Sequence, residues 1–155
     1  MNVKETVLRQ YRAIVNRAAA RVAELSPPRE GWVRTVRTAL GISGPDLAAR
    51  LGLTRARVSQ TEAAERSGGV TIKTMQAVAE AMGCRFVYAI VPGSGTLEDV
   101  IKAQARRKAE ALVRRAGGHM ALEDQALPKD AMRAEIERVA EELARTMPSD
   151  FWKGP

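Results

Sequence analysis

Apolar residues recur every three or four positions along most of the chain, with Arg and Glu between them. Side chains at that spacing share one face of an α-helix, so the pattern predicts a mainly helical fold. Proline and glycine divide the pattern, because proline cannot donate a backbone hydrogen bond and glycine permits tight turns. The segments predicted to be helices span residues 4–25, 30–40, 44–51, 55–64, 72–82, 96–115 and 129–147.

Two stretches depart from the helical period. Residues 84–91 are rich in β-branched and aromatic side chains and end at Pro92, which predicts a β-strand. A lone strand cannot satisfy its own backbone groups, and no other segment is an obvious partner, so we expect it to pair with its copy in a second subunit. Gly117-Gly118 is expected to end the sixth helix and leave residues 119–128 as a loop or short turn.

The composition of the chain limits the classes of protein to which it can belong. The chain has 155 residues and only 4% aromatic side chains, which suits one domain or two small ones packed through aliphatic residues. The single Cys84, which we expect to be buried, excludes an intrachain disulfide, and the single His119 excludes a His-pair metal site. No apolar run approaches the roughly 20 residues that span a bilayer, and charges interrupt the N-terminus, so we expect a cytoplasmic protein with no membrane partner.

Charge is distributed unevenly. The net charge is +7, and residues 1–117 hold 20 Lys or Arg against 10 Asp or Glu, whereas residues 118–155 hold 5 against 8. A basic body with an acidic end suggests a polyanion as partner of the first part and a different surface for the second. Four glutamates face away from the apolar stripe of the last predicted helix, and we expect them to be available to a basic partner: Glu135, Glu137, Glu141 and Glu142.

Residues 43–62 form the most informative motif. Ser43 and Asp46 have the spacing of a capping box before one helix, and Thr54 is a suitable N-cap for the next. Small Ala48 stands where two helices would cross closely, and Gly52 stands in the turn. The apolar residues expected to fix the pair against a core are Leu47, Leu51, Leu53 and Val58. This is the helix-turn-helix pattern, whose second helix enters the DNA major groove. The alternative is an amphipathic helical hairpin, against which the basic charge counts.

The side chains of the second helix suggest how DNA would be bound. Arg55 can make a bidentate contact to guanine and Gln60 to adenine, while Ala56 can touch a thymine methyl group. For Arg57 a phosphate contact is an equal alternative, and any of these side chains could instead be plainly solvated. The complete set of candidate DNA-binding residues is Ser43, Arg50, Thr54, Arg55, Ala56, Arg57, Ser59, Gln60, Thr71 and Lys73.

The motif resembles phage repressors of the Cro/cI (XRE) type, and the resemblance extends over residues 31–83. It implies five short helices and a salt bridge between Arg37 and Glu62 that ties two of them together. Two positions depart from the pattern. Gly44 stands where such repressors commonly have a phosphate-binding Gln, and Thr61 stands at a usually apolar position, where its hydroxyl could bond back to a helix carbonyl.

The whole chain resembles more narrowly the family called mobile mystery protein A. The matching stretches are Pro27-Pro28-Arg29 with Gly31-Trp32, the helix-turn-helix, Tyr88-Ala89-Ile90-Val91-Pro92 and His119-Met120-Ala121-Leu122-Glu123-Asp124-Gln125. This resemblance implies an antitoxin-like regulator encoded beside a Fic-domain partner in mobile elements. The Ser/Thr-x-x-x-Glu-Gly/Asn motif that often inhibits Fic enzymes is absent from the sequence.

Together these observations predict a mainly α protein with a five-helix phage-repressor-like domain, one strand and a C-terminal helical extension. We expect an N-terminal helix over residues 1–26, the DNA-binding domain with its terminal strand over 27–92, and a helical region over 93–155. The expected function is sequence-specific, autoregulatory DNA binding by a homodimer. The alternative is a protein that chiefly inhibits a Fic-domain toxin. His119 and Glu123-Asp124 lack the partners of a catalytic site, so we expect neither an enzyme nor a cofactor or metal.

Overall fold

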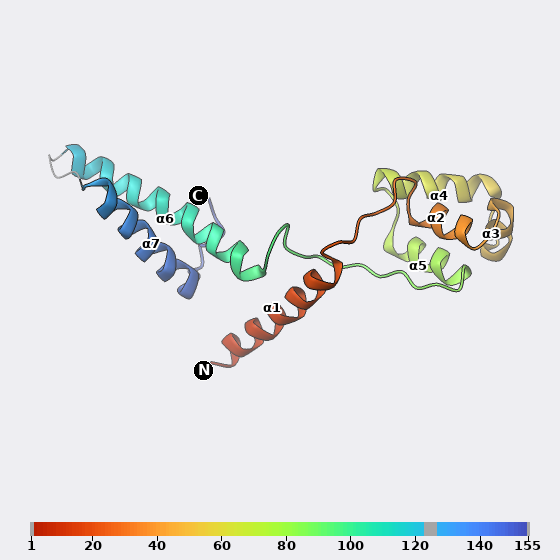
Figure 1. Ribbon diagram of the computed structural model, residues 1–155, viewed down its shortest axis with the longest axis horizontal. Helices are drawn as coiled ribbons and strands as arrows, with labels where there is room; N and C mark the ends of the chain where they lie inside the picture. Colours follow the sequence, from red (N-terminus) through yellow and green to blue (C-terminus); the bar gives the residue numbers. More distant parts are fainter. Residues whose placement is uncertain (1, 123–126, 155) are drawn as a thin grey trace. The chain divides into compact units, whose positions relative to one another are not determined.

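The computed structural model describes residues 2–122 and 127–154 (Figure 1). Within these residues the chain is mainly helical, which confirms the fold class at that level. The helices are α1 (Val3–Val22), α2 (Trp32–Ala39), α3 (Gly44–Leu51), α4 (Arg55–Ser67), α5 (Ile72–Ala81), α6 (Leu97–Leu122) and α7 (Lys129–Thr146). None of the described helices is both long and apolar enough to cross a membrane.

The chain forms two compact units. Residues 24–89 make up the four-helix unit, with α2, α3, α4 and α5. Residues 1–23 and 90–155 make up the hairpin unit, with α1, α6 and α7. The resemblance implies five short helices over residues 31–83, and this stretch of the structure contains four.

The core of the four-helix unit is a cluster of aliphatic and thioether side chains from all four helices. Its buried members are Val33, Leu47, Ala48, Val58, Met75, Val78 and Met82. Leu47 and Ala48 are 0% and 3% exposed, which confirms that α3 is fixed through these two positions. Leu53, expected to join them, is 46% exposed, because it follows the Gly52 turn, outside both helices.

The helix ends in this unit confirm the predicted caps. Ser43 accepts a hydrogen bond from the Asp46 N–H at 3.1 Å, and Asp46 accepts one from the Ser43 N–H at 3.2 Å. Gly52 ends α3 with φ of +64°, in the left-handed region that favours glycine. Thr54 accepts from the Arg57 N–H at 3.2 Å. The turn between α3 and α4 is therefore defined at both ends by local hydrogen bonds.

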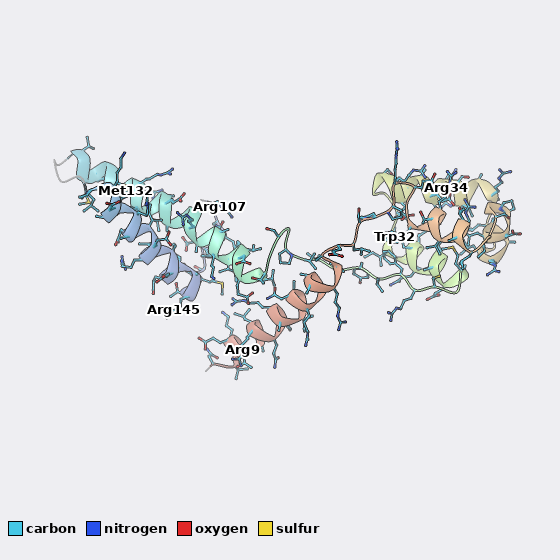
Figure 2. The ribbon with its side chains drawn as sticks, in the orientation of Figure 1. Arg9, Trp32, Arg34, Arg107, Met132 and Arg145 are labelled. Carbon is cyan, nitrogen blue, oxygen red and sulfur yellow. The ribbon has the colours of Figure 1, made fainter. Side chains whose placement is uncertain are left out.

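Several helix limits differ from the prediction: α1 ends at Val22 rather than residue 25 and α2 begins at Trp32 rather than residue 30, and two further differences have a visible cause. Helix α4 runs to Ser67 rather than 64, because Gly68, not the preceding residues, supplies the left-handed ending. Helix α6 runs through Gly117-Gly118 to Leu122. A Cβ atom built at Gly117 would lie 3.3 Å from Cε of Met132, a residue of α7 that Figure 2 labels, so the missing side chain at Gly117 leaves room for Met132. The segment Glu123-Asp124-Gln125 lies outside the described residues.

The hairpin unit is built on the packing of α6 against α7. Small side chains on α6 are buried, with Ala105 and Ala109 at 1% and 0% exposure. Phe151 in the C-terminal tail is also buried, and two buried polar residues of α6 hold this tail. Gln104 Nε2 donates to Phe151 O at 2.8 Å, and Lys108 Nζ donates to Asp150 O and forms a 3.1 Å ion pair with Asp150 Oδ2.

Helix α1 belongs to this unit but has no buried residue. Asn16 joins it to the beginning of α6: its Oδ1 accepts from the Leu97 N–H at 3.0 Å, and its Nδ2 donates to Glu98 Oε2 at 2.7 Å. The latter hydrogen bond holds the pKa of the Glu98 carboxyl below its ordinary value. The side-chain amide of Asn16 therefore caps α6 and also stabilises the charged form of Glu98, the second residue of that helix.

The acidic side chains of α7 are largely paired within the hairpin unit. Glu137 forms a 2.7 Å ion pair with Arg106 of α6. Glu135 and Glu142 form 2.7 Å pairs three residues along their own helix, with Arg138 and Arg145. This face therefore carries less uncompensated negative charge than we expected from its glutamates alone.

The predicted strand is not formed in the described chain. Residues 84–91 have no regular secondary structure, because a strand requires main-chain hydrogen bonds to a neighbouring strand and residues 85–91 make none within the described part of the chain. Phe86 and Tyr88 nevertheless stack, with ring centroids 6.0 Å apart, as expected for alternate residues of an extended backbone. Cys84, expected to be buried, is exposed. It follows the left-handed turn at Gly83, and its N–H bonds back to Ala79 O.

Candidate nucleic-acid interface

Helix α4 has two chemically distinct faces. Val58 and Glu62 are buried, and Thr61 and Glu65 are partly buried. At 3.6 residues per turn these four side chains share one side of the helix. The opposite side carries short side chains, Ala56, Ser59, Ala63 and Ser67, with Gln60 among them. The exposed Arg55, Arg57 and Arg66 flank this strip.

Both carboxylates of α4 are turned towards α2. Glu62, 7% exposed, accepts a hydrogen bond from Arg37 Nε at 2.8 Å. Arg37 Nη1 also donates to Ile42 O at 3.3 Å, so the guanidinium ties α4 to the chain after α2. The ion pair implied by the family resemblance is thus present, and it removes one negative charge from the exposed side of α4.

Glu65 makes the second connection, which the sequence prediction missed. Its carboxylate accepts from the main-chain N–H groups of Trp32 and Val33, at 2.5 and 3.0 Å. Gly31 precedes them with φ of +84°, and a Cβ atom there would lie 2.8 Å from Glu65 Oε2. The carboxylate thus caps the N-terminus of α2, where the helix dipole favours a negative charge. Its spacing of three residues from Glu62 was the available signal, since it places both on one face.

The departure at Thr61 has the predicted local solution. Its hydroxyl donates to Arg57 O at 3.0 Å, one turn back along α4. The polar atom is therefore satisfied within the helix, and the methyl group can face the unit. The sequence was sufficient to predict this hydrogen bond, because a hydroxyl on a partly buried helix face needs an acceptor and a carbonyl one turn back is within reach.

The candidate base-reading residues Arg55, Ala56 and Gln60 lie in the first half of α4, together with the candidate DNA-binding residue Ser59. Arg55, Ala56, Ser59 and Gln60 are all exposed. Arg57 Nη1 donates to Gln60 Oε1 at 3.4 Å, a long contact that leaves the amide group of Gln60 as a donor. The structure therefore places a guanidinium, a methyl group, a hydroxyl and a carboxamide on the first two turns of one exposed helix.

The candidate phosphate contacts are exposed but not equally available. Arg50 Nη1 donates to Ala81 O at 3.1 Å, which links α3 to the end of α5. Ser43 and Thr54 use their hydroxyl oxygens as caps. Thr71 caps α5 by accepting from the Thr74 N–H at 3.1 Å, and Lys73 lies in the first turn of that helix. Lys73 and Arg57 are therefore the candidates whose cationic groups make the fewest strong contacts within the protein and could best contact a phosphate.

The capping box of α3 also has an electrostatic consequence. Hydrogen bonds from the Ser43 hydroxyl and N–H hold the pKa of the Asp46 carboxyl below its ordinary value. The carboxylate stays charged at neutral pH, at the positive end of the α3 dipole. The negative charge of Asp46 therefore lies in the first turn of α3 and stabilises that end of the helix.

An apolar groove of about 240 Å³ opens elsewhere on the four-helix unit. Leu25, Trp32 and Val36 line it together with Met75 and Met82, and the first residues of the extended segment form its rim. Its walls offer no cluster of titratable groups. Among the described residues, no three His, Cys, Asp or Glu side chains are grouped as metal ligands would be.

We compared the chain with known protein families, curated proteins and solved structures. No family model, curated protein or solved structure matches the chain. The resemblances described above therefore stay predictions from the residues that carry them.

Proposed function

We propose that this chain is a sequence-specific DNA-binding regulator and that α4 is its recognition helix. The observation that carries the proposal is the asymmetry of α4. Its two carboxylates bind α2, while its exposed side presents only cations and short or hydrogen-bonding side chains. A helix of this kind can approach a polyanion closely without repulsion from its own acids.

The geometry suits the major groove. Short residues along the centre of the exposed side leave room for base edges. Arg55 carries the pair of donors that reads guanine, and the amide of Gln60 carries the donor and the acceptor that read adenine. Arg57, Arg66 and Lys73 would contact phosphates, which fix orientation but carry no sequence information. The two carboxylate links to α2 hold the helix in place before DNA arrives, so little ordering is required on binding.

Regulation of its own gene, as an antitoxin-like component of a mobile-element gene pair, follows from the family resemblance. The DNA upstream of the gene is accordingly the first probe to use. Such regulators read two half-sites about one helical turn apart, so this function also favours a homodimer.

The deciding experiment is a gel shift with that upstream DNA at about 0.15 M salt, against scrambled DNA of equal length. Arg55→Ala with Gln60→Ala should reduce the preference for the upstream DNA at least tenfold and leave weak, salt-sensitive binding to both probes. The base-reading groups are lost, whereas the phosphate-binding charges of α4 and α5 largely remain.

Arg9→Ala with Gln10→Ala is the matched control. It removes the same two residue types from exposed positions of α1, in the other unit. This variant should keep the preference of the parent protein. Equal losses in both double variants, or none in the first, would contradict the assignment of α4 as the recognition helix.

A further inference from the structure

The apolar groove described above can hold a small ligand, and all of its lining belongs to the four-helix unit. Helix α2 contributes Trp32 and Val36, and α5 contributes Met75 and Ala79. Trp32, which Figure 2 labels, is 38% exposed, so part of the groove wall is open to solvent. The volume of about 240 Å³ equals that of about eight water molecules in the liquid. The groove therefore suits a ligand smaller than the drug-sized molecules that larger pockets hold.

The lining is almost entirely apolar. The aromatic rings of Trp32 and Phe86 and the thioethers of Met75 and Met82 form much of it. Thioether side chains are flexible and adapt to the shape of an occupant. No Asp, Glu or Lys is among the described residues that line the groove. An aliphatic body can therefore leave water for this surface without stripping a carboxylate or an ammonium group of the protein of its hydration.

One cation breaks this apolar lining. Arg85 is the only charged residue among the described residues of the groove wall. Its side chain is exposed and forms no ion pair within the described part of the chain. A guanidinium group presents a planar fork of donors that matches a carboxylate. The groove thus combines an apolar wall with a single available site for an anionic group.

Hydrogen bonds within the unit hold the walls of the groove in place without a ligand. On one side, the Glu65 carboxylate accepts from the N–H groups of Trp32 and Val33 and fixes the beginning of α2. On the other side, the Cys84 N–H donates to Ala79 O at 2.8 Å, which fixes the start of the segment that carries Arg85. Little ordering of the protein is therefore required when a ligand enters, and the cost of binding is correspondingly small.

We infer that this groove binds a small amphipathic carboxylate, with its aliphatic chain against Trp32 and Met75 and its carboxylate paired with Arg85. The aliphatic chain supplies most of the affinity, because it buries apolar surface. The ion pair selects anions over neutral molecules by a few fold only, because the guanidinium is exposed and screened by solvent. The site lies within residues 24–89, so this inference does not rest on the proposed DNA binding.

Two probes with the same aliphatic chain, octanoate and octanol, separate the two contributions. Each should change the fluorescence of Trp32 saturably in a Trp152→Phe background of the full chain, with a dissociation constant of about 1 mM or below. Arg85→Gln should raise the dissociation constant of octanoate about threefold and leave that of octanol unchanged. Arg34→Gln is the matched control, since Arg34 is exposed on α2 outside the groove, and it should change neither value.

A second pair of variants fills the groove. Ala79→Leu places a larger side chain in the groove wall and should weaken the binding of both probes at least tenfold. Ala77→Leu, at an exposed position of the same helix outside the groove, should weaken neither. The urea midpoint of each variant shows whether the unit remains folded. Cys84 lines the groove and is exposed, so saturating octanoate should also slow its alkylation by iodoacetamide in the parent chain.

Three results would overturn the inference. The first is an absence of saturable octanoate binding up to about 10 mM. The second is an octanoate affinity that Arg85→Gln leaves unchanged, or that it reduces no more than the octanol affinity. The third is an apparent octanoate affinity that falls as the protein concentration rises, because a second copy of the chain would then be the occupant of the groove.

Discussion

Individual carboxylates of the four-helix unit either connect two helices or cap a helix. Glu62 joins α4 to Arg37, Glu65 caps α2, and Asp46 caps α3. Each is satisfied by donors from a defined place in the chain. Removing such a group leaves its partner without a counterpart, and the cost depends on how far that partner is buried.

Glu62→Ala should lower the free energy of unfolding of the four-helix unit by about 1–3 kcal/mol, because Arg37 would remain partly buried without its partner. The side chain of Arg37 is 17% exposed. Urea denaturation followed by Trp32 fluorescence in a Trp152→Phe background measures this unit. Glu30→Ala is the control, since its 3.8 Å pair with Arg34 is exposed and should contribute almost nothing. Equal effects of the two substitutions would show that burial of the Arg37 pair is unimportant.

Residue-level expectations were met wherever a local rule sufficed. The caps at Ser43 and Thr54 and the bond of the Thr61 hydroxyl depend on neighbours within four positions. The exposure of Leu53 and Cys84 depends instead on where the chain goes after a left-handed glycine. The periodic pattern carries no information on that direction, and both were wrongly expected to be buried.

At the scale of elements, close packing overrides intrinsic preference. Glycine disfavours a helix by about 1 kcal/mol relative to alanine, yet α6 continues through Gly117 and Gly118. The packing of α6 along α7 outweighs this cost. Helix existence and type were therefore predictable from the period, whereas the ends of α4 and α6 were decided by the position of a left-handed glycine and by a neighbouring helix.

Gly117→Ala should stabilise the hairpin unit by about 0.5–1 kcal/mol, through its greater helix preference. The new methyl group would meet only the flexible end of Met132, 3.3 Å away. Thermal melts followed by Trp152 fluorescence in a Trp32→Phe background report this unit. A lower melting temperature that Met132→Ala restores would show instead that the contact is too rigid to yield.

The connection between α1 and α6 should depend on pH. Because the pKa of Glu98 is below its ordinary value of 4.5 when Asn16 bonds it, the charged form favours attachment above that pH. The stabilisation is lost as pH falls through the lowered pKa of the attached state. The protection factors of the α1 amides, which are corrected for the intrinsic pH dependence of hydrogen exchange, should therefore fall on acidification below about pH 4.5.

Asn16→Ala is the variant that isolates this effect. It should speed exchange in α1 already at neutral pH and return the pKa of Glu98 towards its ordinary value, as read by carboxyl NMR shifts. Exchange in α1 would then no longer respond to the titration of Glu98. An unchanged pH profile in this variant would place the control of α1 elsewhere.

At the scale of the whole molecule, the two units have separate cores. The core cluster of the four-helix unit draws its side chains from residues 33–86, and the buried side chains of the hairpin unit lie on α6 and in the C-terminal tail. The pairing of α1 with α6 across the intervening unit was not predictable, because periodicity describes each helix alone and says nothing of which distant helix it contacts.

Deleting residues 118–155 should leave the four-helix unit folded and able to bind DNA, while α6 loses α7 and the tail. We expect the urea midpoint reported by Trp32 to change little and the helical signal to fall by more than the deleted residues account for. Deleting residues 72–81 is the contrasting change, since it removes Met75 and Val78 from the core. Loss of the Trp32 transition on the first deletion would show that the cores are coupled.

The interrupted hairpin unit also constrains the order of events at the ribosome. Helix α1 emerges first, but Leu97 and Glu98, which Asn16 binds, are synthesised about 80 residues later. All of the four-helix unit emerges in between and can fold while Asn16 of α1 is still without its partners in α6. At about 5–20 residues per second this interval lasts several seconds. A nascent chain that ends at residue 95, stalled behind an added C-terminal linker long enough to span the exit tunnel, should thus hold a folded four-helix unit and a protease-sensitive α1.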